Sequence, residues 1–517
     1  MTLASFPADS LAAKKRRGLI TLSVMAATIM QTIDTTIANV ALPEMQGSMG
    51  VFQDQISWVL TSYVLAAAIF IPLTGYLVAR IGRRRLFLIS VVGFTLASML
   101  CGAAQDIYQL VLFRFVQGVF GAPLVPLSQS VMLDTYPREK HGSAMAMWGM
   151  GVMLGPIIGP TLGGYLTEYY SWRWVFYVNL PVGMLTWLGL TLFLKETPLN
   201  NERRFDLLGF AFLAVAIGAF QMMLDRGESL NWFASGEIVV EAMVAGLFFY
   251  LFMAHVLTTR NPFIEPRMFN DRNFTCGMLL MFVIGIILLA VLALLPPFMQ
   301  TLMGYPTLDV GILLAPRGAG TMLSMMIMGR IVGRVDPRIL MFGGLLLVTH
   351  SLWEMTRFTA EVSSTAIVTS GFVQGLGLGC IFVPLSTVSF ATLAPHYRDE
   401  ATPLYNLVRN LGSSIGVSIV ITLLARNSQA NHEILASYIT PFNLALREAG
   451  QAFDGSLPGL MAINTEVTRQ ATILAYLQDF RFMMWLTLAS ILLLLLFRTP
   501  GEHVAQNTEG EPEPATN

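Results

Sequence analysis

The chain has 517 residues, of which 54% are hydrophobic and only 12% are charged. Soluble globular domains carry about 25% charged residues, so this composition excludes a soluble protein and indicates one that crosses a membrane many times. The net charge of −1 gives no sign of a nucleic-acid partner. Cys101, Cys276 and Cys380 have neither metal-ligand spacing nor a disulfide pattern. We expect no metal, no cofactor and no nucleic acid.

The first apolar segment follows the basic run Lys14–Arg17 and contains Asp34. It is too long for a signal peptide and has no small-residue cleavage site, so we interpret it as a transmembrane helix. A bilayer core of about 30 Å requires about 20 apolar residues per helix. On this basis the sequence predicts fourteen spans, at 19–41, 55–79, 87–105, 110–131, 143–165, 175–194, 207–224, 236–257, 273–295, 309–329, 339–356, 366–388, 404–424 and 481–497.

The basic residues between these spans fall mostly on one side of the membrane, as the positive-inside rule requires of the cytoplasmic side. The pattern predicts that both termini are cytoplasmic. The segment 426–479 is predicted to be a long polar loop on the outer side. Either a solvated connector or a docking surface for a partner outside the membrane fits this segment. Residues 499–517 are acidic and are predicted to be a disordered cytoplasmic tail.

An internal repeat gives the architecture. The run Phe115–Gly118 recurs as Phe372–Gly375, and each copy is followed by a Val-Pro-Leu-Ser run. Such repeats in transporters are homologous halves that rock around a site at mid-membrane. We therefore predict an all-α membrane protein with two six-helix bundles and an inserted helix pair. The predicted segments are an N-terminal tail at 1–18, bundles at 19–195 and 273–498, and the inserted pair at 205–258.

Asp34 is the most informative residue of the first span. Charging a carboxyl at the bilayer centre costs about 2.5–3.5 kcal/mol, so a carboxyl kept there is better suited to carrying a proton than to folding. Its helical neighbours Gln31, Thr35 and Asn39 have polar side chains that can hydrogen-bond either protonation state or a substrate.

Four short motifs follow one another in the N-terminal half. They are Ile33–Pro43, Gly75-x-Leu77-x-x-Arg80-x-Gly82-Arg83, Leu110-x-x-x-Arg114-x-x-Gln117-Gly118, and Gly155-x-x-x-Gly159-Pro160-x-x-Gly163-Gly164. With these motifs the chain resembles the major facilitator superfamily. Within that superfamily it is similar to the fourteen-span drug:proton antiporter (DHA2) branch and its EmrB-type multidrug export proteins. The resemblance covers nearly the whole chain and implies the major facilitator fold.

The resemblance implies that Gly75, Arg80, Gly82 and Arg83 form the cytoplasmic gating motif. The aspartate usual in this motif is Ala79 here, so we expect the contacts that close the gate to be weaker or differently built. A basic loop that only obeys the positive-inside rule is the alternative.

Arg114 belongs to a motif that the resemblance links to proton transfer. A guanidinium keeps its proton in a protein, so Arg114 is not the carrier. It is expected to act on a nearby carboxylate, and Asp34 is the carboxylate that we predict. Two alternatives stay open: Arg114 snorkels to the outer end of its helix, or its pairing with Asp34 serves assembly alone.

The fifth-span motif resembles the signature of antiporters, and it favours export over uptake. Its glycines allow close helix contact, and its proline adds a kink. One upstream glycine of the full motif is replaced by Ala146.

Other polar residues of the spans are candidates for the substrate cavity. With Gln31, Thr35 and Asn39 they are Gln117, Gln129 and Gln374, while Arg317 and Arg409 are further charges without an assigned role. The sequence has no Walker motif and no nucleophile triad, so we do not expect an enzyme.

We therefore expect a secondary active exporter that releases hydrophobic or amphipathic toxic compounds in exchange for protons. The resemblance implies the bacterial inner membrane, together with a periplasmic adaptor and an outer-membrane channel. A proton-coupled uptake symporter for a specific metabolite is the alternative.

Overall fold

The computed structural model describes residues 11–197, 205–260, 262–440 and 457–498, and within them it contains helices and no strand. The N-terminal helices are α1 (Leu11–Met49), α2 (Gln53–Phe70), α3 (Leu73–Ile81), α4 (Arg83–Ala103), α5 (Ile107–Gly121), α6 (Leu124–Thr135), α7 (His141–Tyr169), α8 (Trp174–Tyr177) and α9 (Asn179–Phe193). They are followed by α10 (Leu207–Arg226), α11 (Gly236–Thr258), α12 (Arg272–Pro297), α13 (Thr307–Ile331), α14 (Pro337–Met355), α15 (Ser364–Ser389), α16 (Arg398–Ser437) and α18 (Leu457–Ser490).

Each of the fourteen predicted spans coincides with helical residues. Among the described residues, twelve helices are long and apolar enough to cross a membrane, or thirteen if α2 and α3 count as one span bent by 59°. The remaining predicted span is α14, which carries Arg338, His350 and Glu354 and is not among them. The predicted tail 1–18 is helical from Leu11 onward, and residues 1–10 and 499–517 lie outside the described part.

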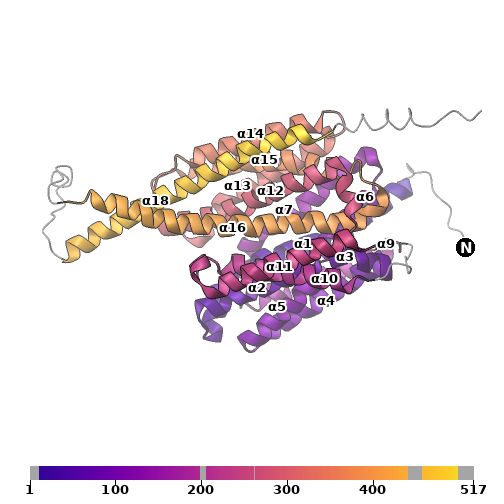
Figure 1. The fold of residues 1–517 in the computed structure, drawn as a ribbon, viewed down its shortest axis with the longest axis horizontal. Helices are drawn as coiled ribbons and strands as arrows, with labels where there is room; N and C mark the ends of the chain where they lie inside the picture. Colours follow the sequence, from indigo (N-terminus) through magenta and orange to yellow (C-terminus); the bar gives the residue numbers. More distant parts are fainter. Residues whose placement is uncertain (1–10, 198–204, 261, 441–456, 499–517) are drawn as a thin grey trace, which may run out of the picture.

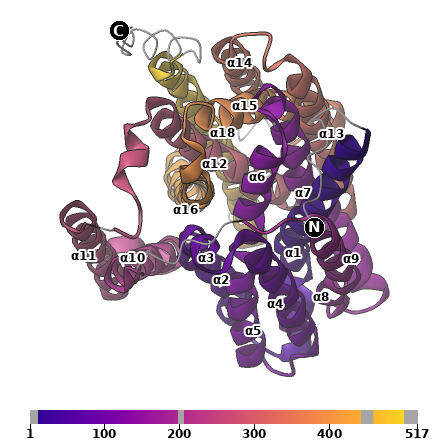
Figure 2. The same cartoon turned by 90° about the vertical axis from the view of Figure 1, so that its right-hand side faces the viewer.

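The two halves repeat one pattern of helix packing. In the first half, α1 packs on α7, α2 on α5, and α4 on α9. In the second half, the corresponding pairs are α12 with α16, α13 with α15, and α14 with α18. Figure 2 shows the two groups side by side, with α10 and α11 beside them. The same pairing in both halves is what a duplicated six-helix unit produces.

One end of the bundle, which we call the basic end, contains Arg83, Arg272 and Arg398. The first residues of α1 lie there, at the right of Figure 1. So does the end of the short helix η6 (Ile491–Leu496), because Arg272 donates to the carbonyl of Leu496 at 2.6 Å. The first and last described helices thus begin and end on the same side.

The inserted pair α10–α11 contacts both halves. α10 packs on α2 of the first half and on α16 of the second. Ser418 Oγ of α16 donates to the Leu224 carbonyl at 3.0 Å, and Trp232 Nε1 donates to Thr422 Oγ1 at 2.9 Å. The pair is therefore attached to α16 at the end away from the basic end.

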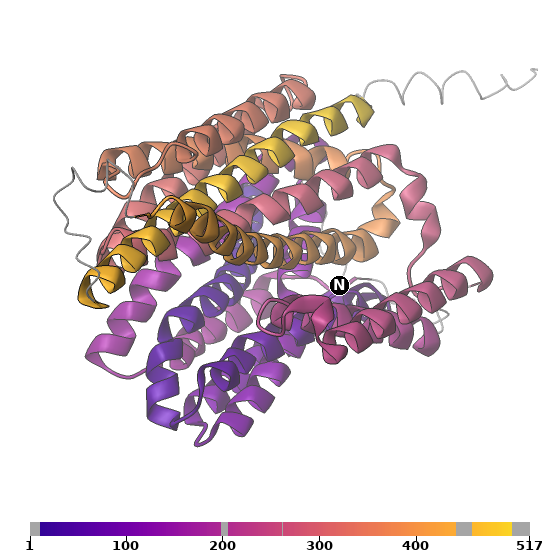
Figure 3. The same ribbon diagram turned by 60° about the vertical axis from the view of Figure 1, so that its left-hand side comes forward.

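The segment 426–479, predicted to be a long polar loop, is helical over most of its described residues. α16 continues to Ser437 and α18 begins at Leu457, so only the residues between them can form the turn, and 441–456 lie outside the described part. Figure 1 shows the ends of both long helices extending past the rest of the bundle, and Figure 3 shows α18 lying across α16. Asn431 Nδ2 donates to Gln478 Oε1 at 3.3 Å, and Ser428 and Thr472 hydroxyls lie 3.1 Å apart. The polar residues that suggested a loop form the contact between two helices.

Candidate functional site

Asp34 is fully buried in α1, and both of its carboxylate oxygens accept hydrogen bonds. Arg114 Nη1 donates to Oδ2 at 2.7 Å. Gln117 Nε2 and Asn179 Nδ2 donate to Oδ1 at 2.8 and 2.7 Å. The donors come from α5 and α9, so the carboxylate ties three helices of the first half together. Burial of an ion pair costs solvation free energy, which these additional donors offset.

Arg114 points into the first half rather than toward the end of its helix. It is also fully buried, and its Nε donates to the Val59 carbonyl at 3.3 Å. Its guanidinium carbon lies 4.4 Å from the centre of the Tyr63 ring, a cation–π contact. The side chain therefore does not snorkel.

The pair fixes how α1 lies against α5. Removal of either partner would leave the other buried without its counter-charge, which is costly. A change at Asp34 is therefore expected to favour a rearrangement of α1 relative to α5.

The glycines of the antiporter-like motif on α7 face α1 next to Asp34. A Cβ atom at Gly159 would lie 2.0 Å from Thr36 Oγ1, and one at Gly155 would lie 2.5 Å from the Thr32 backbone. Thr36 Oγ1 also donates to the Gly155 carbonyl at 3.0 Å. Because these threonines flank Asp34 on α1, a movement of α1 must change its contact with α7.

The other members of this motif are placed differently. A Cβ at Gly163 would lie 2.9 Å from Ile37 of α1, whereas one at Gly164 would have nothing within 4 Å. Pro160 lies inside α7. Ala146, which replaces an upstream glycine, faces Gly329 of α13, where an added Cβ would approach it to 2.7 Å.

Two arginines and two aspartates join the halves at the basic end, and we call them the ion-pair cluster. Arg83 of α4 contacts Asp134 of α6 and Asp399 of α16, each at 2.7 Å. Arg398 of α16 contacts Asp134 at 2.8 Å. Ser130 Oγ donates to Asp399 at 2.6 Å. The cluster therefore holds the N-terminal half against α16.

The rest of the predicted gating motif lies around this cluster. A Cβ at Gly75 would come within 2.9 Å of the Asp399 carbonyl, so α3 and α16 are in close contact. Gly82 has φ +91°, a conformation that favours glycine. Arg80 is exposed at the end of α3. With Ala79 in place of the usual aspartate, the acidic partners of Arg83 come from α6 and α16.

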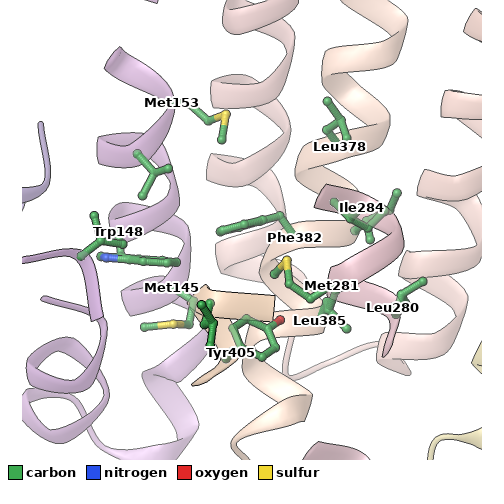
Figure 4. Packing of buried hydrophobic residues seen from close by; sticks show 14 of the residues in the cluster. Met145, Trp148, Met153, Leu280, Met281, Ile284, Leu378, Phe382, Leu385 and Tyr405 are labelled. Carbon is green, nitrogen blue, oxygen red and sulfur yellow. The ribbon is translucent and has the colours of Figure 1, made fainter. Parts of the chain in front are cut away.

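Deeper in the molecule the halves meet through large apolar side chains. Trp148 of α7 stacks on Phe382 of α15, with ring centres 5.7 Å apart, and Figure 4 shows Met145 and Met153 on the same helix as Trp148. At this interface Asn406 Nδ2 donates to Gln129 Oε1 at 2.7 Å, a hydrogen bond between the two halves.

The six candidate cavity residues do not form one group. Gln117 belongs to the Asp34 site, and Gln129 bonds Asn406 across the halves. Gln31 and Thr35 are half-buried, and Asn39 is exposed. Gln374 is fully buried in α15.

A separate cavity of about 310 Å³ lies between α2, α5 and α10. Its wall is mostly apolar, and Arg226 lies over Trp58 at 5.8 Å. It lies between the first half and the inserted pair, away from Asp34. The described residues contain no group of three or more potential metal-ligating side chains.

Comparison with known proteins identifies the family. The model of the Major Facilitator Superfamily matches residues 24–417. The chain belongs to this superfamily. Among curated relatives, Multidrug export protein EmrB of Escherichia coli (strain K12) is 36% identical over 488 residues, covering 92% of this chain and 94% of that protein. Fatty acid resistance protein FarB of Neisseria gonorrhoeae is 35% identical over 462 residues, covering 88% and 91%. These findings confirm the resemblance to EmrB-type transporters.

Solved structures support the fold. The human organic anion transporter MFSD10 (TETRAN) superposes with a TM-score of 0.62 at 13% identity, covering 91% of this chain and 99% of that one. The proton:xylose symporter XylE gives a TM-score of 0.58 at 14% identity, covering 91% and 96%. The all-helical major facilitator fold that the sequence predicted is confirmed.

Sequence reasoning missed Asn179, Asp134 and Asp399. Asn179 is a single amide at the start of an apolar helix, and it has no motif spacing to other polar residues that would predict a contact with Asp34. Asp399 comes second in α16, where an acidic residue is common at any helix start. Of the ion-pair cluster, the predicted gating motif contained only Arg83.

Proposed function

We propose that this chain is a proton-coupled exporter of hydrophobic or amphipathic drug-like compounds. The observation that carries the proposal is the buried Asp34–Arg114 pair beside the glycine face of α7. Proton coupling requires a carboxylate at mid-membrane whose contacts change when it is protonated. Relatives of similar length are named multidrug export protein and probable multidrug resistance protein, which supports drug-like compounds as substrates.

We infer that the basic end faces the cytoplasm and that the protein lies in a bacterial inner membrane. If α14 and the bent pair α2–α3 each count as a span, there are fourteen spans. An even number of spans places both termini on the cytoplasmic side. In the described residues, the ion pairs between the two halves lie near the basic end. The present conformation is therefore interpreted as closed to the cytoplasm.

Proton entry supplies the driving force in this proposal. Each charge that crosses releases about 2.3 kcal/mol per 100 mV. Protonation of Asp34 releases Arg114, the α1–α7 contact shifts, and the ion-pair cluster opens toward the cytoplasm so that substrate enters. Asp34 then releases its proton to the cytoplasm as substrate binds, its carboxylate pairs with Arg114 again, and the basic end closes so that the substrate is exported.

A periplasmic adaptor and an outer-membrane channel complete the proposed pathway. The helices α16 and α18 project together at the end opposite the basic end (Figure 1). Ile434, Leu460 and Met461 are exposed on them, and apolar side chains outside the bilayer are typical of a protein contact.

The test is efflux of a fluorescent hydrophobic dye from vesicles with an imposed proton gradient. The wild type is compared with Asp34→Asn and with the matched control Glu354→Gln, a partly exposed acidic residue of α14. We expect gradient-driven efflux in the wild type and the control and its loss in Asp34→Asn.

Two other outcomes refute the proposal. Dye accumulation driven by the gradient in the wild type would indicate uptake by symport. Unchanged efflux in Asp34→Asn would mean that the pair with Arg114 serves assembly and that the proton binds elsewhere.

A further inference from the structure

The cavity between α2, α5 and α10 has the size and the wall of a ligand site. Its volume is about 310 Å³, at the lower end of the range of about 300–1,000 Å³ for small-molecule pockets. Leu65, Phe115 and Met222 are among the apolar side chains of its wall. Tyr108 and Leu112 line it and are exposed, so the cavity opens at the lipid-facing surface of the bundle.

The packing of α10 explains why a gap is left here. In its middle, α10 touches α2, since a Cβ atom at Gly218 would lie 3.5 Å from Ile69. Near its last turn, α10 is bonded to α16 instead, because the Leu224 carbonyl accepts from Ser418 Oγ. This end of α10 is therefore held toward α16, and the space that it leaves beside α2 and α5 is the cavity. Apolar walls without contacts lose dispersion energy, so we expect an occupant to stabilise this arrangement.

The cavity changes from polar to apolar along the helices. Trp58 and Tyr108 lie near the first residues of α2 and α5, at the end of the bundle away from the basic end. Tryptophan and tyrosine are enriched at membrane–water interfaces. Leu65 and Phe115 lie seven residues further along the same helices, about 10 Å deeper. This order matches a lipid, whose headgroup lies at the interface and whose acyl chains point toward the middle of the membrane.

A buried hydroxyl group in the wall has no partner. Ser62 is 5% exposed, and its Oγ makes no hydrogen bond among the described residues. It lines the cavity one helical turn beyond Trp58, about 6 Å deeper. A buried hydroxyl without a hydrogen bond is costly, and here it can donate to an acceptor in the cavity. The ester carbonyl of a phospholipid is such an acceptor at this depth, just below the headgroup.

The mouth of the cavity carries both signs of charge. Arg226, which lines it, pairs through Nη1 with Glu237 and Glu241 of α11, the latter at 3.8 Å. Its Nε and Nη2 make no hydrogen bond within the described part of the chain. The Oε2 atom of Glu241 is buried and is likewise without a partner there. Donors for a phosphate and acceptors for an ammonium group are therefore unused and close together.

The balance of charge selects a zwitterionic headgroup. One guanidinium faces two carboxylates, and Asp225, which accepts from Gln221 at 3.3 Å, adds a third on the same turn of α10. A headgroup with a net negative charge would be repelled by these acidic residues, because like charges across a contact cost free energy. A headgroup that holds an ammonium group beside its phosphate complements the site.

We propose that this cavity binds one phospholipid with an ethanolamine headgroup. Arg226 binds its phosphate, and Glu237 and Glu241 accept from its ammonium group. Ser62 donates to an ester carbonyl, and one acyl chain lies along Leu65 toward mid-membrane. The lipid fills the gap between the inserted pair and the first half. With the basic end in the cytoplasm, as proposed above, it belongs to the outer leaflet.

A transported hydrophobic cation is the competing occupant, since its charge would also suit the glutamates. It offers no acceptor to the unused N–H groups of Arg226 or to the hydroxyl of Ser62, so both would stay unsatisfied. The phospholipid satisfies all of these groups at once, and the observations therefore favour it.

Native mass spectrometry of the purified full-length protein tests the headgroup. The protein is delipidated and titrated with phosphatidylethanolamine or phosphatidylglycerol of identical acyl chains. We expect one phosphatidylethanolamine per chain, bound at least tenfold more tightly than phosphatidylglycerol. Equal affinity for the two lipids, or the absence of a tightly bound lipid, would overturn the proposal.

Variants locate the lipid. Arg226→Gln removes the donor to the phosphate, and Ser62→Leu fills the cavity without a change of charge. Each is expected to weaken the binding of phosphatidylethanolamine at least tenfold. Arg357→Gln is the matched control, because Arg357 likewise lies over a tryptophan ring, 3.6 Å from the centre of Trp353, and does not line the cavity. Unchanged affinity in both test variants, or an equal loss in the control, contradicts the assigned place.

Fluorescence quenching in vesicles tests the occupant in a membrane. A brominated acyl chain quenches a tryptophan that it contacts, and the signal of Trp58 is the difference between the wild type and Trp58→Phe. Trp58 should be quenched more strongly by brominated phosphatidylethanolamine than by brominated phosphatidylglycerol. This preference should vanish in Ser62→Leu, and its persistence there would place the lipid outside the cavity.

The same signal decides between the lipid and a drug-like cation. Addition of tetraphenylphosphonium, a hydrophobic cation, should leave the quenching of Trp58 unchanged. Relief of the quenching would assign the cavity to drug-like compounds and overturn the proposal. None of these measurements uses a proton gradient, so they decide the lipid site independently of the proposed export.

Discussion

Replacement of Arg83 by glutamine is expected to open the basic end. Arg83 makes two ion pairs of 2.7 Å, to Asp134 and Asp399. A hydrogen bond to a charged group contributes about 1.5–3 kcal/mol, but the aspartate side chains are 35% and 25% exposed, so solvent weakens both pairs. We therefore assign about 2 kcal/mol to the two together, which is about a 30-fold change in the ratio of closed to open protein.

The assay is a distance measurement between spin labels on either side of the ion-pair cluster. The exposed residues Arg85 and His396 are replaced by cysteine in a protein whose three native cysteines are alanine. We expect the short distance to dominate in the wild type, and a longer distance to gain population in Arg83→Gln.

Arg330→Gln is the matched control. Arg330 is an exposed arginine of α13 that also lies at the basic end, and it takes no part in the ion-pair cluster. An unchanged distance distribution in Arg83→Gln would refute the argument that these ion pairs hold the halves together. An equal shift in the control would attribute the effect to net charge.

Three further changes have defined outcomes. Gly159→Ala should reduce dye efflux at least tenfold at matched expression, since its Cβ would lie 2.0 Å from Thr36 Oγ1, whereas Gly164→Ala, with nothing within 4 Å, should leave efflux unchanged. Asp206→Ala removes the acceptor for the backbone of Gly209 and Phe263 and the side chain of His255. We expect the free energy of unfolding to fall by about 2–3 kcal/mol, measured as a lower melting temperature of the purified protein. An unchanged melting temperature would contradict the anchoring role of Asp206. Met461→Glu should abolish drug resistance in cells and leave dye transport in vesicles intact, and resistance that persists would show that this surface does not bind the adaptor.

The sequence predicted Asp34 as a functional residue because a carboxyl at mid-membrane is costly, and the motif of Arg114 predicted that this arginine acts on a nearby carboxylate. The structure pairs the two at 2.7 Å. The sequence also predicted the two halves, since a repeated motif is visible without any structure. Asn179 could not be found in this way. A lone amide has no characteristic spacing, and its approach to Asp34 depends on how α9 packs against α1 and α4.

The helical extension of α16 was missed for a different reason. Hydropathy identifies residues that face lipid, and Ser428 and Asn431 face α18 instead. Polar contacts between two helices give a segment the composition of a loop. The partners of Arg83 were missed because they come from distant segments, α6 and α16.

The length of α16 has a mechanical consequence. This single helix of 40 residues carries Asp399 at one end and ends at Ser437 in the projecting part. At about 1.5 Å per residue it is a rod of about 60 Å, so a tilt of about 10° at the cluster would displace the far tip by about 10 Å. Opening of the cytoplasmic side would therefore be transmitted through the protein to its outer surface. An adaptor bound there would sense which way the cavity faces without any contact with proton or drug.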